Sequence, residues 1–134
     1  MMKTVLIVDD DADMRRLIAV LLDGEFTVVQ ARDGSEGLRA LQEHHPALAI
    51  IDLGMPGMSG LDLLRAARKD GGSTSFIMLT GSHENDSIVA ALAAGAATYI
   101  TKPWEPERLR AEIRRHLSPA KPGRASGRPW RIER

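Results

Sequence analysis

The sequence contains no cysteine, which excludes disulfide bonds and cysteine-ligated metal sites. It also lacks a long apolar stretch, since runs such as Leu17–Leu22 are far shorter than the roughly 20 residues that cross a bilayer. The first residues, MMKTVLIVDDD, differ from a signal peptide because their apolar run is short and ends in acids. We therefore expect a soluble, cytoplasmic protein that does not bind a membrane.

Several common ligand signatures are missing as well. Gly54, Gly57 and Gly60 do not form a dinucleotide-binding or P-loop pattern. The histidines show no metal-ligand spacing, which favours surface roles for all of them: His44, His45, His83 and His116.

The acidic run DDDAD at residues 9–13 resembles the start of a calcium-binding loop without completing one. Met14 stands where such a loop needs glycine, and Val20 stands where it needs a bidentate glutamate. Asp11 and Asp13 are better placed to open a helix, whose N-terminal dipole favours acids.

The size and the charge distribution indicate one domain followed by a tail. At 134 residues, with 43% hydrophobic and 27% charged residues, the chain has the composition of an ordinary globular domain. Residues 1–117 hold 13 basic and 17 acidic residues, whereas residues 118–134 hold 5 and 1. Residues 118–134 are rich in proline and glycine, so we expect a disordered tail or linker. Its basic signal is too weak to predict a nucleic-acid partner.

Short apolar runs alternate five times with helical patterns along residues 1–117. The runs are rich in Val, Ile and Leu, which is typical of parallel strands buried on both faces. They lie at residues 4–8, 26–31, 47–51, 75–79 and 97–101. Short connections and right-handed crossovers predict an α/β fold of the (βα)5 type. We expect a doubly wound, five-stranded parallel sheet with the flavodoxin-like order 2-1-3-4-5.

Helix boundaries can also be predicted. Asp33 with Glu36, and Ser59, are suited to begin the second and third helices. Gly24 and Gly95 are suited to end the first and fourth helices, and Pro106 fits the first turn of the fifth.

Polar residues follow the predicted strands at their carboxyl ends: Asp9, Asp10, Asp52, Thr80 and Lys102. Carboxyl ends of parallel strands meet at one edge, where open α/β sheets bind ligands. Carboxylates held close together repel one another unless a cation lies between them. The pattern therefore predicts a divalent metal site, and a lysine and a hydroxyl beside it predict an anionic ligand such as a phosphoryl group.

Four segments, in their order and spacing, resemble the receiver domain of bacterial two-component response regulators: VLIVDDD, IIDLGMPGMSGLDLL, IMLTG and GAATYITKPW. The resemblance covers about residues 3–117. It implies that Asp52 accepts a phosphoryl group from a phosphohistidine of a sensor histidine kinase or a phosphotransfer protein. It also implies slow autodephosphorylation and a signalling switch rather than an enzyme with an external substrate.

The same resemblance implies roles for the neighbouring residues. Asp10, Asp52 and the backbone carbonyl of Gly54 would bind Mg²⁺, with Mn²⁺ as a substitute, and Asp9 would bind it through water. Thr80 and Lys102 would contact the phosphoryl group.

Other implied features concern switching. The Lys102–Pro103 peptide bond would be cis, which costs little before proline. Tyr99 would swing inward when Thr80 moves. The face formed by the fourth helix, fifth strand and fifth helix would then bind a partner or pair two receivers.

Three positions depart from the usual pattern of the family. Gly54 and Ser82 are small where many relatives carry larger side chains beside the path of an attacking water, so we expect weak shielding of the phosphorylated form. Trp104 replaces the more usual phenylalanine, for which we expect a packing consequence alone.

Two other functions fit parts of the sequence. A Mg²⁺-dependent phosphohydrolase with an aspartyl nucleophile could use Asp9 and Asp11 after the first strand, but the chain lacks the cap that encloses a substrate. A flavin protein of similar topology lacks a hydroxyl-rich phosphate loop, and the acids would repel the flavin phosphate.

Overall fold

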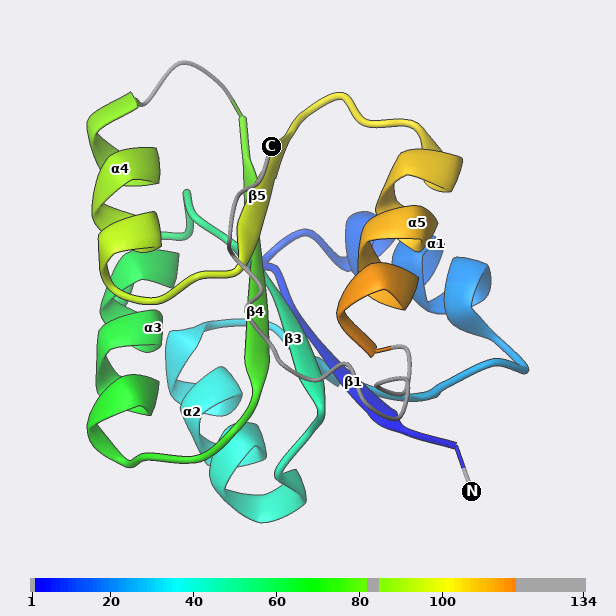
Figure 1. The fold of residues 1–134 in the computed structure, drawn as a ribbon, viewed down its shortest axis with the longest axis horizontal. Helices are drawn as coiled ribbons and strands as arrows, with labels where there is room; N and C mark the ends of the chain where they lie inside the picture. The colour runs from blue at the N-terminus through cyan, green and yellow to red at the C-terminus, as the bar shows by residue number, and fades with distance from the viewer. Residues whose placement is uncertain (1, 82–84, 118–134) are drawn as a thin grey trace, which may run out of the picture.

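The chain folds into one five-stranded parallel sheet with helices on both faces (Figure 1). The computed structural model describes residues 2–81 and 85–117. The strands are β1 (Thr4–Val8), β2 (Thr27–Ala31), β3 (Leu48–Asp52), β4 (Ser75–Thr80) and β5 (Thr98–Thr101). Their order, β2-β1-β3-β4-β5, confirms the predicted doubly wound topology. The predicted tail, 118–134, lies outside the described residues.

The helices alternate with the strands, as predicted, and divide between two layers. The helices are α1 (Ala12–Leu22), α2 (Gly34–His44), α3 (Gly60–Lys69), α4 (Asn85–Ala93) and α5 (Pro106–Leu117). Figure 1 shows α1 and α5 on one face of the sheet and α2, α3 and α4 on the other.

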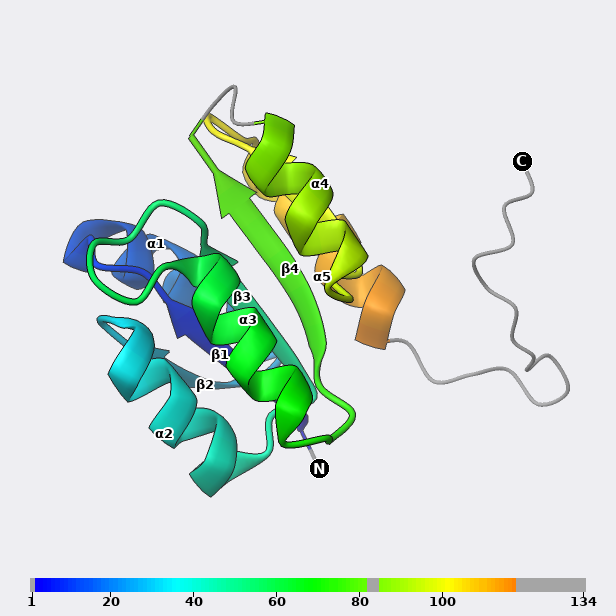
Figure 2. The ribbon, with the colours of Figure 1, turned by 90° about the vertical axis from the view of Figure 1, so that its left-hand side faces the viewer.

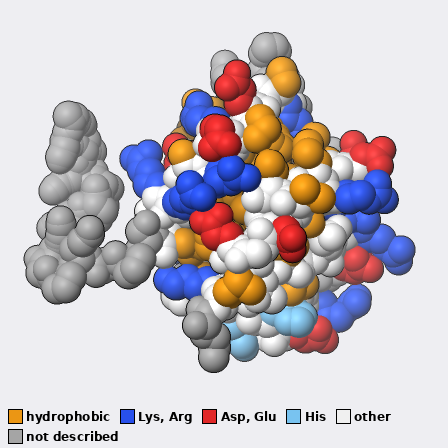
Figure 3. Space-filling model, turned by 90° about the vertical axis from the view of Figure 1, so that its right-hand side faces the viewer, with side chains coloured by type: hydrophobic (Ala, Val, Ile, Leu, Met, Phe, Trp, Pro, Cys, Tyr) orange, Lys and Arg blue, Asp and Glu red, His pale blue; other side chains and the backbone are white. Residues whose placement is uncertain are grey.

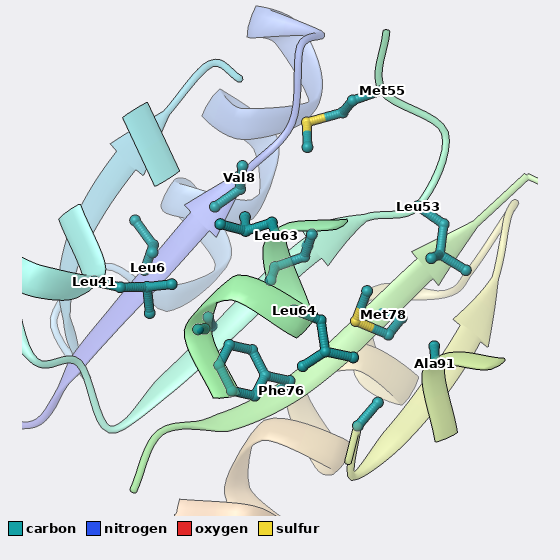
Figure 4. Packing of buried hydrophobic residues seen from close by; sticks show 14 of the residues in the cluster. Leu6, Val8, Leu41, Leu53, Met55, Leu63, Leu64, Phe76, Met78 and Ala91 are labelled. Carbon is teal, nitrogen blue, oxygen red and sulfur yellow. The ribbon is translucent and has the colours of Figure 1, made fainter. Parts of the chain in front are cut away.

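Two hydrophobic cores result from the alternation of side chains along the central strands. Leu6 and Val8 of β1 pack on the side of α2, α3 and α4, together with Met78 and Leu63 (Figure 4). The intervening residues of β1 pack with Ile18 of α1 and with α5 on the opposite side. Because both faces of β1, β3 and β4 are covered, these strands are buried as the sequence predicts.

The edge strands differ from the predicted pattern. Thr27 and Gln30 of β2 are exposed, as are Tyr99 and Thr101 of β5, because each of these strands has a neighbour on one side alone. The central strands also run further than expected. Asp52 pairs with Leu79, and Thr80 pairs with Thr101, so Asp52 and Thr80 are the last residues of their strands rather than the first residues after them.

Local side-chain contacts explain where the helices begin. Asp11 is the N-cap of α1, and its carboxylate accepts from the backbone N–H groups of Asp13 and Met14. Ser59 begins α3 in a complete capping box with Asp62. Asp33 caps α2, but the Glu36 carboxylate accepts from the N–H of Arg32 and not from that of Asp33. The predicted starts of these helices are confirmed, with the reciprocal bond at α2 displaced by one residue.

The face that carries α1 and α5 has basic and acidic side chains close together (Figure 3). The Arg114 guanidinium binds both carboxylate oxygens of Glu25, at 2.9 and 3.2 Å, and Arg110 pairs with Glu107 at 2.9 Å. Hydrophobic side chains gather between these charged groups in Figure 3. Among the described residues, none of the helices combines the length and apolar content needed to cross a membrane.

Candidate functional site

Three carboxylates and one ammonium group meet at the carboxyl edge of the sheet, the upper edge in Figure 1. One oxygen from each of Asp9, Asp10 and Asp52 lies within 4.8 Å of the others. The Lys102 ammonium lies 3.3 Å from Asp52 Oδ1 and 3.9 Å from Asp9 Oδ2. The structure therefore brings together four residues that β1, β3 and the end of β5 supply from distant parts of the sequence.

The Asp52 carboxylate is held in a fixed position. It is 7% exposed, and its Oδ1 atom accepts from the backbone N–H of Gly54 at 3.1 Å and from Lys102 Nζ at 3.3 Å. The next peptide is also fixed, because the N–H of Leu53 donates to the carbonyl of Leu79 at 2.8 Å. An acid on a fixed strand end, held by donors on one oxygen, is suited to react at a defined point.

Asp9 is the most deeply buried acid of the site. Its side chain accepts from the N–H of Asp11 at 2.9 Å through Oδ1, whereas Oδ2 is buried with no hydrogen-bond partner among the described residues. Burial, with a smaller contribution from the negative charges of Asp52 and Asp10, raises the pKa of Asp9 from 3.8 to about 6. The Asp11 N–H and the Lys102 charge oppose this rise. A buried carboxylate oxygen without a donor is costly unless a cation approaches it.

These residues fit a hard divalent cation. Carboxylate and carbonyl oxygens are the ligands that Mg²⁺ prefers, and it commonly keeps several waters. Asp10 is exposed, so it leaves one side of the cluster open to solvent. Asp9 Oδ2, which has no hydrogen-bond donor among the described residues, and the convergence of three acids are both suited to a cation at this position.

Thr80 and Lys102 occupy neighbouring strand ends. Thr80 is buried, and its carbonyl accepts from the N–H of Lys102 at 2.7 Å, which fixes the backbone that carries the ammonium group. The Lys102–Pro103 peptide bond is cis, the isomer that the resemblance implies. Tyr99 is 37% exposed, and the pairings of Met78 with Tyr99 and of Thr80 with Thr101 place it on the same face of the sheet as Thr80.

Gly60 contributes to the site in a way that sequence reasoning missed. A Cβ atom at Gly60 would lie 2.9 Å from Leu53 Cα and would also overlap the carbonyl oxygen of Asp52. Only glycine therefore lets the start of α3 approach the Asp52 backbone this closely. The spacing of Gly54, Gly57 and Gly60 in the sequence does not reveal a close approach of two backbone segments.

Arg15 is a second contributor that the sequence did not indicate. Its Nη1 atom donates to the carbonyl of Asp9 at 2.7 Å, and its Nε atom donates to Gln30 Oε1 at 3.2 Å. It thus ties the turn after β1 to β2. In the sequence, the only indication of this contact is the position of Arg15, six residues after Asp9 and in the first turns of α1.

Two further predicted positions can be placed. Asp11 caps α1, and the acid that lies beside Asp9 and Asp52 is Asp10. The site therefore does not contain the pair of Asp9 and Asp11 that the phosphohydrolase interpretation requires. A Cβ atom at Gly54 would lie 3.9 Å from Asp52 Oδ1, so a side chain there would stand beside the acceptor. Ser82 lies outside the described residues.

Comparison with known proteins gives consistent matches. The profile of a family described as "Response regulator receiver domain" matches residues 5–114. The DNA-binding response regulator MtrA of Mycolicibacterium paratuberculosis is 38% identical over 118 residues, which are 87% of this chain and 52% of the relative. The two-component response regulator PhoP of Pseudomonas aeruginosa is 42% identical over 110 residues, 81% of this chain and 49% of the relative. The chain thus spans about half the length of these relatives.

Solved structures support the same comparison. The chemotaxis protein CheY4 of Vibrio cholerae superposes with a TM-score of 0.82 at 32% identity, and the match covers 87% of this chain and 100% of CheY4. The signal receiver domain of a LuxO repressor protein from Vibrio parahaemolyticus gives a TM-score of 0.82 at 27% identity, covering 87% of this chain and 91% of that one.

Proposed function

The chain belongs to the family of response regulator receiver domains of two-component systems, and we propose that Asp52 is its phosphoacceptor. The donor is a phosphohistidine of a sensor histidine kinase or of a phosphotransfer protein. The observation that carries the proposal is the buried Asp52 carboxylate, held beside Asp9, Asp10 and Lys102 at the edge of the sheet. Residues 1–117 would form the receiver, and residues 118–134 would be a tail or linker.

The transfer forms one bond and breaks one. An oxygen of Asp52 bonds to phosphorus as the bond between phosphorus and the imidazole nitrogen breaks, and the electron pair of that bond stays on the imidazole. Slow autodephosphorylation reverses the modification: water attacks phosphorus, the bond between phosphorus and the Asp52 oxygen breaks, and inorganic phosphate and the Asp52 carboxylate are released. The Gly54 N–H and the Lys102 ammonium on Oδ1 fix the plane of the carboxylate during these steps.

The acidic residues would hold the divalent ion. Asp10, Asp52 and the Gly54 carbonyl would bind Mg²⁺ or Mn²⁺ directly, with Asp9 holding it through water. When bound, the ion supplies positive charge between the carboxylates and the phosphoryl oxygens. Lys102 adds a second positive charge, 3.3 Å from the accepting carboxylate, where the phosphoryl group brings more negative charge.

Thr80 and Tyr99 would transmit the phosphorylation of Asp52 to the surface of the protein. Phosphorylation places new acceptor oxygens beside β4, and Thr80 moves to donate to one of them. Tyr99 lies on the same face of the neighbouring strand and follows inward. The exposed face of α4, β5 and α5 carries Val89 at 64% and Leu92 at 41% exposure. This face binds the partner or a second receiver.

The test uses acetyl phosphate, a small phosphoryl donor, with intact-protein mass spectrometry. The wild-type protein is expected to gain one phosphoryl group with Mg²⁺ present and none in EDTA. Asp52→Asn is expected to gain none. Asp13→Asn is the matched control, because Asp13 is exposed in the first turn of α1, and it should behave as the wild type. Modification of Asp52→Asn at the wild-type level would refute the assignment.

A further inference from the structure

A cavity of about 420 Å³ lies at the edge of the sheet opposite to Asp52, between the C-terminal ends of α2 and α3. Figure 2 shows these two helices side by side over the sheet, and Pro46 and Thr74, which precede β3 and β4, mark the edge. Its volume falls in the range of about 300–1,000 Å³ that small-molecule sites occupy. The phosphoacceptor site uses none of its lining residues.

The cavity has an apolar wall and a polar rim. Leu38, Leu41, Ala67 and Phe76 form the wall, and Leu41 and Phe76 are seen from close by in Figure 4. The rim includes Gln42, His45, Arg68, Asp70 and Thr74. Such a combination suits a ligand with an apolar body and one polar end.

The Arg68 side chain in the rim has N–H donors that make no hydrogen bond to the described residues. The Arg68 Cζ atom lies over the Phe76 ring, 5.3 Å from its centroid, and the Nη2 atom donates to the Gly95 carbonyl at 2.6 Å. A guanidinium carries five N–H donors, so within the described part of the chain this bond accounts for one of them.

Three of the other polar side chains of the rim, those of Gln42, Asp70 and Thr74, are paired within the protein. Asp70 Oδ2 accepts from Gln42 Nε2 at 3.1 Å, and Thr74 Oγ1 donates to the Pro46 carbonyl at 2.7 Å. The contact with the Phe76 ring holds the Arg68 guanidinium beside the apolar wall. This geometry favours a planar anion, because a carboxylate can accept two parallel N–H groups of arginine.

We propose that this cavity binds a small aromatic or similarly planar carboxylic acid. The carboxylate pairs with Arg68, and the ring lies against Leu41 and Phe76. Since the guanidinium also holds the Gly95 carbonyl, which lies just after the end of α4, a ligand that draws Arg68 inward weakens that bond. The amide of Ala96, which belongs to the same peptide as the Gly95 carbonyl, then reports on the movement.

Benzoate is the probe, followed by backbone amide chemical shifts in ¹⁵N-labelled protein. Saturable shifts are expected in residues 41–46 and 67–76 and at Ala96. Arg68→Met is expected to raise the Kd at least about tenfold, the loss typical of a hydrogen bond to a charged group. Asp70→Asn should lower the Kd several-fold, because it removes a negative charge from the rim while its amide oxygen can still accept from Gln42.

Benzamide, which has the same shape without charge, is expected to bind at least several-fold more weakly than benzoate. Equal binding of benzamide, an unchanged Kd in Arg68→Met, weaker binding in Asp70→Asn, or shifts confined to other regions would overturn the proposal. The Asp70→Asn result stands even if Arg68→Met folds poorly. The phosphorylation assay on Asp52 is independent of this site, so failure of one proposal does not imply failure of the other.

Discussion

Replacement of Asp9 by asparagine is expected to stabilise the ion-free protein. The carboxylate is 1% exposed, and its Oδ2 atom has no hydrogen-bond partner in the part of the chain that the structure describes. The pKa of about 6, compared with the ordinary value of 3.8, means that ionisation of this carboxylate costs the folded state about 3 kcal/mol, at about 1.36 kcal/mol per pKa unit. Asparagine keeps the oxygen that accepts from the Asp11 N–H but carries no charge. The asparagine amide nitrogen must still be buried at the position of Oδ2, so a gain of about 1–3 kcal/mol is expected above pH 7.

The effect of Asp9→Asn on the free energy of unfolding should depend on pH. Because the folded protein raises the pKa of Asp9, it binds the proton more tightly than the unfolded chain does. The ionised carboxylate therefore destabilises the fold above pH 6, and this cost disappears as the pH falls from about 6 towards 3.8. The advantage of Asp9→Asn over the wild type should shrink over the same interval.

The assay is urea unfolding in EDTA at several pH values, with Asp10→Asn as the control. Asp10 is exposed, so its replacement should change the free energy of unfolding much less. With Mg²⁺ added, the wild type should gain more stability than Asp9→Asn, because a ligand that binds only the folded state stabilises it by RT ln(1 + [L]/Kd), and the loss of the Asp9 carboxylate should raise the Kd for the ion. A less stable Asp9→Asn protein in EDTA at pH 8, or an advantage that does not change between pH 8 and pH 5, would refute the reasoning.

Three other substitutions test the site. Gly60→Ala is expected to lower the free energy of unfolding by about 1–3 kcal/mol, because its Cβ atom would overlap the backbone of residues 52 and 53. Gly81 has open space around it, so Gly81→Ala should change the free energy of unfolding by no more than about 0.5 kcal/mol in the same urea titration. Gly54→Asn places a side chain beside Asp52 Oδ1 and should lengthen the phosphoaspartate lifetime several-fold, as should Ser82→Glu; unchanged lifetimes in both would contradict weak shielding. Lys102→Met should raise the pKa of Asp9 further, since the ammonium charge lowers it, and carboxyl ¹³C titration should show no such rise in Lys69→Met.

The sequence contained enough information to predict the fold and the principal residues of the site. Parallel strand topology forces the ends of β1, β3, β4 and β5 to one edge, so Asp9, Asp52, Thr80 and Lys102 could be grouped from their strand-end positions. The same logic could not distinguish edge strands from central ones. It therefore overstated the burial of β2 and β5.

Other features depend on tertiary geometry that has no local sequence signal. The contact of Gly60 with the Asp52 backbone arises from the angle at which α3 meets the sheet. The bond from Arg15 to the Asp9 carbonyl arises from the path of α1 beside β2. The buried, unpartnered oxygen of Asp9 is likewise a property of the assembled site, although the need for a cation among the acids was predicted from their proximity.

The most direct measurement identifies the residue that carries the phosphoryl group. Phosphorylated protein is treated with borohydride, which reduces an aspartyl phosphate to homoserine, and then digested with trypsin for peptide mass spectrometry. We expect homoserine at position 52, in the peptide of residues 40–65, and unmodified aspartate at position 62 of the same peptide. Homoserine at Asp9, Asp10 or Asp62 in place of Asp52, or no homoserine in protein that has gained a phosphoryl group, would contradict the assignment of Asp52 as the phosphoacceptor.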